Sequence, residues 1–89
     1  MASDFHITIL LPDRVAYEGK ASSLVVPAEL GYLGVLAHHA PIIARLKAGK
    51  ITLREGGKVT SFELDSNGFL EFSDNNATLV LNSIKLLPS

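Results

Sequence analysis

The sequence contains no cysteine and no tryptophan, and neither sign of charge dominates it. Without cysteine the chain has no disulfide framework and no thiolate chemistry. Eight Lys and Arg against nine Asp and Glu give a formal net charge of −1. Nucleic-acid binding depends on clustered Lys and Arg, so this balance argues against a nucleic-acid partner.

A long hydrophobic run is also missing. The longest uncharged stretch, about 15 residues between Glu29 and Arg45, contains two His, two Gly and one Pro. A membrane-spanning helix needs about 20 predominantly apolar residues. The first four residues, Met-Ala-Ser-Asp, lack the basic start of a signal peptide. We therefore expect contact with a membrane only through a partner protein.

What the sequence does contain is short alternating segments separated by turn residues. Phe5, Ile7 and Ile9 alternate with polar residues, which is typical of a half-buried strand. The best hairpin signal is Gly-Gly within residues 55–58, because two glycines supply the positive φ angles of a tight turn. That turn predicts a register with Glu55 opposite Lys58 and Ile51 opposite Phe62.

Several other segments have a weaker pattern of alternation, and their strands are predicted from turn residues as well. We expect a weaker strand over residues 14–20 that ends or bulges at Gly19. Residues 23–26 are expected to form a strand covered on both sides and stopped by Pro27. After the strand at residues 77–81, even a full helix over the tail 82–89 would be marginal, because the segment is short and contains Pro88.

The turn spacing predicts an all-β fold, a two-sheet antiparallel β-sandwich of about nine to ten short strands. With 89 residues the chain is expected to be a single domain, residues 1–89. Neighbouring apolar residues such as Phe69 and Leu70, or Leu79 and Val80, point to opposite faces of a strand. Apolar side chains on both faces of a small sandwich indicate an interaction surface.

The least generic stretch is residues 31–41, Gly-Tyr-Leu-Gly-Val-Leu-Ala-His-His-Ala-Pro. Its leucines are spaced as in a helix, but Gly31 and Gly34 would each cost about 1 kcal/mol inside one. Pro41 also biases Ala40 toward an extended backbone. We therefore predict a glycine-marked turn, a short apolar strand and a second turn at the histidines.

This stretch resembles the Gly-x-Leu-Gly-x-x-x-x-His-Ala-Pro signature of the epsilon subunit of F-type ATP synthases. Further agreement lies at Val-Val-Pro (25–27), Leu-Lys-Ala-Gly (46–49) and Ser-Asn-Gly-Phe-Leu-Glu (66–71). The resemblance covers nearly the whole chain and implies the N-terminal β-sandwich of that subunit, without the C-terminal helical hairpin that the family usually adds. It also implies a non-catalytic rotor subunit that braces the gamma subunit against the membrane rotor ring.

The resemblance implies two groups of contact residues. The gamma-subunit contact maps to His39, Pro41 and Ala44, although His39 could instead make only a structural hydrogen bond. The rotor-ring contact maps to Glu29, Leu30, Gly31 and Tyr32, which could equally form an ordinary exposed turn. The family usually has Gly where this chain has His38, so a differently shaped turn is expected there.

Other kinds of chemistry are not indicated. No serine lies in a nucleophile motif and no pair of carboxylates stands out as an acid–base couple. His38 and His39 are adjacent, so on a strand they point apart and do not bind one metal ion together. Gly31-x-x-Gly34 lacks the Lys and helix start of a phosphate loop. We expect no enzyme activity, metal, nucleotide site or cofactor.

The resemblance implies two partners, the gamma subunit and the subunits of the rotor ring. It implies a peripheral location on the cytoplasmic face of the bacterial cell membrane rather than on the chloroplast thylakoid. The alternative function is a small-ligand or carbohydrate-binding β-sandwich. With two Tyr, four Phe and no Trp, the chain is poorly equipped for that role.

Overall fold

The computed structural model describes residues 3–88, and within that range every regular element is a β-strand. The expected all-β fold is confirmed. The ten strands are β1 (Phe5–Leu11), β2 (Arg14–Ala21), β3 (Ser23–Ala28), β4 (Gly31–Leu36), β5 (Ile42–Leu46), β6 (Gly49–Glu55), β7 (Lys58–Leu64), β8 (Gly68–Ser73), β9 (Asn76–Leu81) and β10 (Ile84–Leu86).

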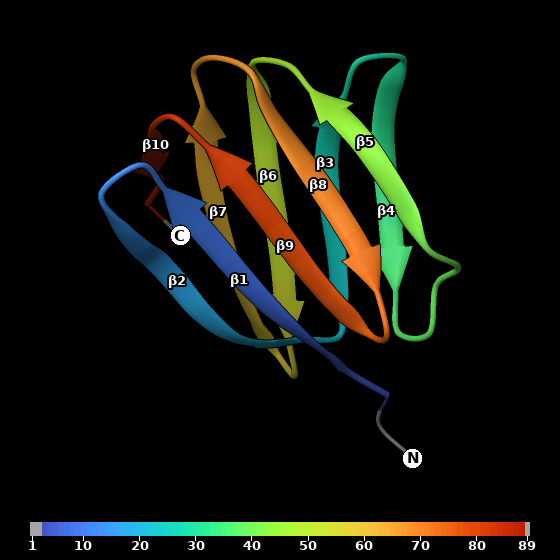
Figure 1. Ribbon diagram of the computed structural model, residues 1–89. Helices are drawn as coiled ribbons and strands as arrows, with labels where there is room; N and C mark the ends of the chain where they lie inside the picture. The colour runs from blue at the N-terminus through green and yellow to red at the C-terminus, as the bar shows by residue number, and fades with distance from the viewer. Residues whose placement is uncertain (1–2, 89) are drawn as a thin grey trace.

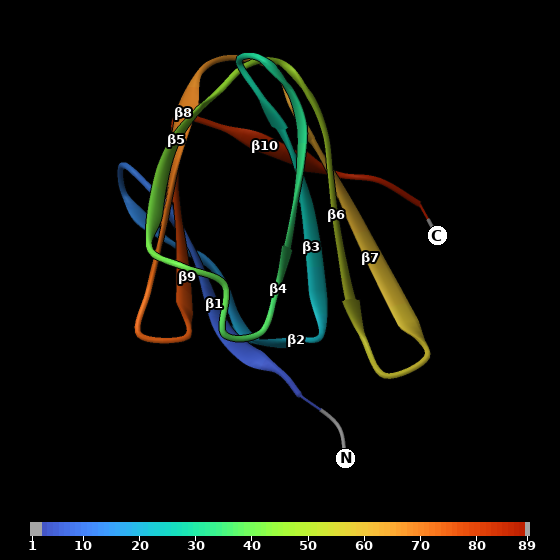
Figure 2. The same ribbon diagram turned by 90° about the vertical axis from the view of Figure 1, so that its right-hand side faces the viewer.

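The strands form one curled sheet with two five-stranded halves. One half has the order β4-β3-β6-β7-β10 and the other the order β5-β8-β9-β1-β2. The halves are linked by a single pairing of Ala28 on β3 with Leu46 on β5. Figure 1 shows the second half in front of the first, and Figure 2 shows the two layers from the side.

The sheet is not wholly antiparallel, and the prediction was wrong on this point. β1 runs parallel to β9, with His6 opposite Asn76 and Leu10 opposite Val80. A tight hairpin forces neighbouring strands to be antiparallel, but about seventy residues separate β1 from β9, so no turn constrains their direction.

The core lies between the two layers. Strand β1 shows how alternation builds it, because Phe5, Ile7 and Ile9 are buried while His6 and Thr8 are half-buried on the other face. The ring of Phe5 meets that of Phe72 on β8 edge-on, with 5.4 Å between centroids. No polar or charged side chain is fully buried among residues 3–88, so the core is held by apolar burial.

The predicted hairpin at residues 55–58 is confirmed in its register. Glu55 pairs with Lys58, and Ile51 pairs with Phe62. Gly56 has a φ of 60°, in the left-handed region that glycine adopts without steric cost. A second tight turn joins β8 to β9 through Asp74 and Asn75, with φ values of 50° and 60°.

Strand β2 was predicted to end or bulge at Gly19, and this was wrong. The strand continues to Ala21, and the irregularity lies nearer its start. Ile9 pairs with Tyr17 and Leu10 with Val15, so Ala16 is the extra residue. The extra residue reverses the alternation, which leaves Val15 exposed and Tyr17 half-buried.

Two expectations for β3 were also wrong. Pro27 does not stop the strand, which runs on to Ala28, because the carbonyl of Pro27 still accepts a hydrogen bond from the Lys47 N–H at 2.9 Å. The strand is not covered on both sides either. Val25 is exposed on the outer face, while Leu24 and Val26 are buried.

The tail contains a strand that the sequence analysis did not place. Residues Ile84–Leu86 form β10, which pairs with Leu64, Glu63 and Phe62 of β7. The segment carries too little alternation to be recognised alone, and the exposed edge of β7 organises it. The segment forms a strand and no helix, which agrees with the expectation that a helix here would be marginal.

Candidate protein-binding surfaces

The sequence signature forms turn, strand and turn, as predicted. Strand β4 spans Gly31–Leu36, with turns at Glu29–Leu30 before it and Ala37–His38 after it. The His39 turn and the Glu29–Leu30 tip therefore lie at opposite ends of β4. At about 3.3 Å per residue, these two ends are separated by roughly 17 Å. Ala44 is the exception, because β5 runs back toward the tip and Ala44 lines a groove together with Glu29 and Tyr32. Figure 1 shows the β3–β4 turn at the top of the sandwich and the β4–β5 connection at the bottom.

His39 is half-buried and has a fixed orientation. Its Nδ1 lies 2.6 Å from the carbonyl oxygen of Ala40. Because a carbonyl only accepts, Nδ1 carries the proton. The ring also meets the buried Phe72 edge-on at 5.9 Å. The structural hydrogen bond considered for His39 is therefore present, and the arrangement leaves Nε2 available to a partner.

The turn before His39 has an unusual backbone. His38 has a φ of 65°, the left-handed region in which side chains are strained and glycine is favoured. Glycine adopts the same backbone conformation without steric cost, so the differently shaped turn expected at this position stays a prediction. The His38 N–H donates to the side-chain oxygen of Asn75 at 2.8 Å, which ties this turn to the β8–β9 turn.

The other two residues expected at the gamma-subunit contact, Pro41 and Ala44, differ in their exposure. Pro41 is exposed just before the strand. Ala44 is half-buried and packs against the core, in register with the buried Leu70. It faces inward beside a groove of about 460 Å³ between β4 and β5, whereas its neighbours Ile43 and Arg45 face outward.

At the other end of β4, the expected rotor-ring residues form an exposed tip. Leu30 is fully exposed, at 100%. Glu29 and Gly31 flank it, and Gly31 has a φ of 134° with nothing within 4 Å of its missing Cβ. Lys47 and Asn67 from neighbouring loops border a hollow of about 190 Å³ beside Glu29. The sequence analysis did not assign these two residues to the tip.

Tyr32 is oriented differently from its neighbours at the tip. Its hydroxyl accepts a hydrogen bond from the Lys50 N–H at 3.1 Å, so the side chain is tied to the start of β6. A Cβ on Gly49 would lie 3.0 Å from that hydroxyl and 2.6 Å from Pro27. Tyr32 thus lies over a site that only glycine fits, while its ring remains exposed.

The clearest exposed apolar surface is a row of side chains across the front half of the sheet. Arg45, Phe69, Val80 and Leu10 are successive register partners on β5, β8, β9 and β1, and we call them the outer row. Phe69 and Val80 are each 48% exposed. Ile43, which lies two residues before Arg45 on the same face of β5, is 73% exposed. The guanidinium of Arg45 lies 5.9 Å from the Phe69 ring centroid. The prediction that neighbouring apolar residues on these strands point to opposite faces is confirmed, because Leu70 and Leu79 are buried while Phe69 and Val80 are exposed.

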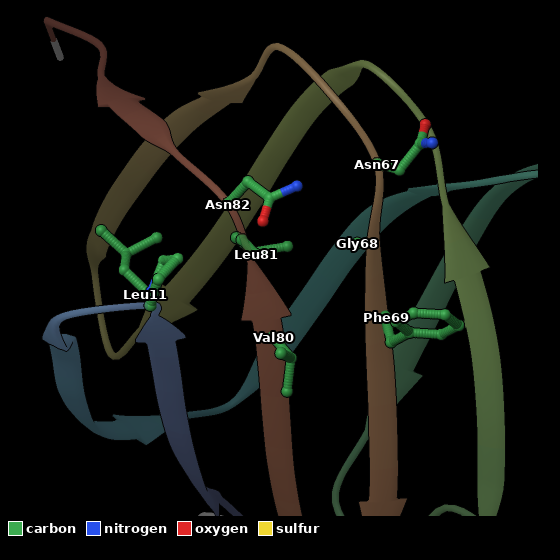
Figure 3. A pocket seen from close by; sticks show the side chains of 8 residues that line it. Leu11, Asn67, Gly68, Phe69, Val80, Leu81 and Asn82 are labelled. Atoms are coloured by element: carbon green, nitrogen blue, oxygen red, sulfur yellow. The ribbon is translucent and has the colours of Figure 1, made fainter.

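The two middle residues of the outer row, Phe69 and Val80, border a small hollow. It has a volume of about 230 Å³ and lies between the ends of β1 and β9 and the start of β8. Figure 3 shows Asn67 and Asn82 at its rim, with Phe69 and Val80 below them. An apolar floor with two carboxamides at the edge can receive a partner side chain and hydrogen-bond its backbone.

The described residues contain neither a cluster of metal ligands nor a helix that could span a membrane. Among residues 3–88 no three His, Asp or Glu side chains cluster as metal ligands would. In the same range no helix is long and apolar enough to cross a membrane. The fold and its surfaces define an all-β sandwich domain with exposed apolar side chains on its outer face.

Comparison with known proteins identifies the family. The model of the ATP synthase delta/epsilon chain β-sandwich domain matches residues 4–86, so the chain belongs to this family. An epsilon chain from Leptospira borgpetersenii is 33% identical over 89% of this chain and 61% of its own length. A chloroplastic epsilon chain from Emiliania huxleyi is 36% identical over 86% of this chain and 58% of its own.

Solved structures agree with the fold. A chain in the mitochondrial ATP synthase of Euglena gracilis, in a structure of OSCP, F1 and c-ring, superposes with a TM-score of 0.87. The sequence identity is 21%, and the match covers 94% of this chain and 54% of that one. The chain thus spans about 60% of the length of the curated relatives above. These relatives do not support the alternative of a small-ligand or carbohydrate-binding sandwich.

Proposed function

We propose that this chain is the sandwich part of an epsilon-type rotor subunit, which links a gamma subunit to the membrane rotor ring. Its family membership supports this role, since the relatives are epsilon chains of ATP synthase. The role is mechanical and needs two separate binding surfaces on a stiff body. On this proposal the subunit lies on the cytoplasmic face of a bacterial membrane and meets the membrane only through its partners.

The single observation that carries the proposal is the position of the two candidate surfaces on one strand. The His39 turn and the Glu29–Leu30 tip are at opposite ends of β4. Because β4 is hydrogen-bonded to β3 along its whole length, the two ends move as one unit. A force applied at one end is therefore transmitted to the other without bending a loop.

We assign the gamma-subunit contact to His39, Pro41 and the outer row, whose Arg45 end reaches the tip, because the Arg45 carbonyl accepts from the Glu29 N–H at 2.9 Å. The exposed Ile43 connects the two regions, because it lies on β5 between Pro41 and Arg45. Exposed aromatic and apolar side chains with an arginine beside them match the composition of interface centres. Ala44 faces inward, so we expect it to act by packing under this surface.

We assign the rotor-ring contact to residues 29–32. Leu30 supplies an exposed apolar side chain and Glu29 a charge. The Tyr32 ring, anchored through its hydroxyl, gives a rigid side to the tip. An anchored aromatic residue loses little conformational entropy on binding, which suits an interface.

Titration calorimetry with a purified gamma subunit tests the first assignment. We expect wild type to bind gamma. His39→Ala should bind about tenfold or more weakly, because the polar contact that the imidazole makes with gamma is lost. Leu86→Ser, on exposed β10 at the back, serves as a control and should bind as wild type does. Unchanged affinity of His39→Ala would show that His39 is only structural.

A further inference from the structure

Asn75 connects three segments that are distant in sequence. Its side-chain oxygen accepts from the His38 N–H at 2.8 Å, and its side-chain nitrogen donates to the Asp4 carbonyl at 2.9 Å. Its own carbonyl accepts from the His6 N–H at 3.2 Å. The β4–β5 turn, the β8–β9 turn and the start of β1 are thus joined through one half-buried residue.

The bond to His38 stabilises a conformation that is otherwise unfavourable. His38 has a φ of 65°, and a residue with a side chain pays a steric cost there. One N–H···O bond from the next turn offsets part of that cost. Asn75 itself has a φ of 60°, which asparagine tolerates better than most residues.

The backbone of His38 decides where the His39 ring points. His39 follows directly, and its own N–H donates to the Leu36 carbonyl at 3.2 Å, which closes the turn. In this turn the imidazole meets Phe72 edge-on at 5.9 Å. Phe72 and Asn75 belong to the same β8–β9 hairpin, so this hairpin contacts both the turn and the ring that follows it.

We propose that Asn75 is a positioning residue for His39 and thereby sets the affinity of the gamma-subunit contact. The effect on gamma-subunit binding rests on the proposed function. The positioning of His39 by Asn75 rests only on the contacts described above. Asn75 acts through the His38 backbone. Its loss therefore changes the direction of the His39 ring before any partner is present.

The chain offers a matched set of variants. Asn75→Gly removes both side-chain bonds while tolerating the positive φ, so the hairpin still forms. Asn75→Asp retains an acceptor for the His38 N–H and loses the donor to Asp4. Asp74→Gly lies in the same turn at a φ of 50°. Within residues 3–88 the Asp74 carboxylate takes no part in these bonds, so this variant is the control.

The first measurement is the carbon–proton NMR spectrum of the histidine rings in the isolated protein, with the His39 signal assigned by its absence in His39→Ala. We expect the His39 signal of Asn75→Gly to move toward the position of a freely exposed histidine. It should stay near the wild-type position in Asn75→Asp and Asp74→Gly. An unchanged signal in Asn75→Gly would overturn the positioning role, provided the far-UV spectrum shows intact strands.

The second measurement is the affinity for the gamma subunit by calorimetry. We expect Asn75→Gly to bind about three- to tenfold more weakly, in line with the loss of the bond from the His38 N–H, and Asn75→Asp, which keeps that acceptor, to recover most of the difference. Wild-type affinity in Asn75→Gly with a displaced His39 signal would overturn the link to binding. Failure of the wild type to bind gamma would refute the proposed function, while the NMR result would still decide the positioning role.

Discussion

Phe69 on β8 and Val80 on β9 are direct register partners on the outer face of the sandwich, and both are 48% exposed. Their chain neighbours Leu70 and Leu79 form the matching pair on the inner face and are fully buried. The hairpin is therefore apolar on both sides. Burial of the inner pair stabilises the fold, whereas the outer pair gains that stabilisation only when a partner covers it.

Phe69→Ser separates binding from folding. We expect the affinity for the gamma subunit to fall by tenfold or more, because a half-exposed aromatic side chain at an interface centre is lost. The free energy of unfolding should change by less than about 0.5–1 kcal/mol, since the side chain faces outward. Val59→Ser on β7, in the other half of the sheet, is the matched control. Equal affinity for the two variants would exclude the outer row from the contact.

Gly68→Ala tests the close packing of β8 against β9. A Cβ at this position would lie 2.9 Å from the Val80 carbonyl oxygen and would also overlap the Leu81 side chain. The backbone of β9 cannot move away without a cost in free energy. We therefore expect a loss of about 1–3 kcal/mol of unfolding free energy in urea titrations. Gly34→Ala should be nearly neutral, because nothing lies within 4 Å of its missing Cβ. A stable Gly68→Ala protein would show that the two strands are not in such close contact.

Tyr32→Phe tests the anchoring of the tip. The variant loses the hydrogen bond from the Lys50 N–H to the phenol oxygen and should lower the unfolding free energy by about 0.5–1.5 kcal/mol. Thermal unfolding measures the difference. Tyr17→Phe is the control, because the Tyr17 ring packs on Phe62 and its hydroxyl makes no hydrogen bond within residues 3–88. If both variants lose the same stability, the Lys50 bond does not anchor Tyr32.

Much of the fold could be predicted because its signals are local. Alternation placed Phe5, Ile7 and Ile9 in the core, and the Gly-Gly turn set the register of Glu55 and Lys58. The errors concern pairings between distant segments. The parallel direction of β1 and the formation of β10 depend on strands far away in the chain, which no short window of sequence reveals.

The candidate surfaces, like the fold, could be predicted only where the signal is local in the sequence. The sequence could reveal that Phe69 and Leu70 point to opposite faces, but only the packing of the sheet shows that Phe69 is the outward one. The inward direction of Ala44 depends on its register with Leu70 of β8, which only the pairing defines. Asn75 could not be found from sequence, because its two side-chain bonds span 37 and 71 positions.

Co-purification from solubilised membranes of the source organism tests the central claim most directly. An affinity-tagged chain is added to the membranes, and the bound proteins are identified by mass spectrometry. The account predicts that a gamma subunit and the rotor-ring subunits elute with the wild type, and that recovery of the gamma subunit is strongly reduced with Phe69→Ser but not with Val59→Ser. Recovery of the folded wild-type chain with neither partner would contradict the assignment of this chain to the rotor.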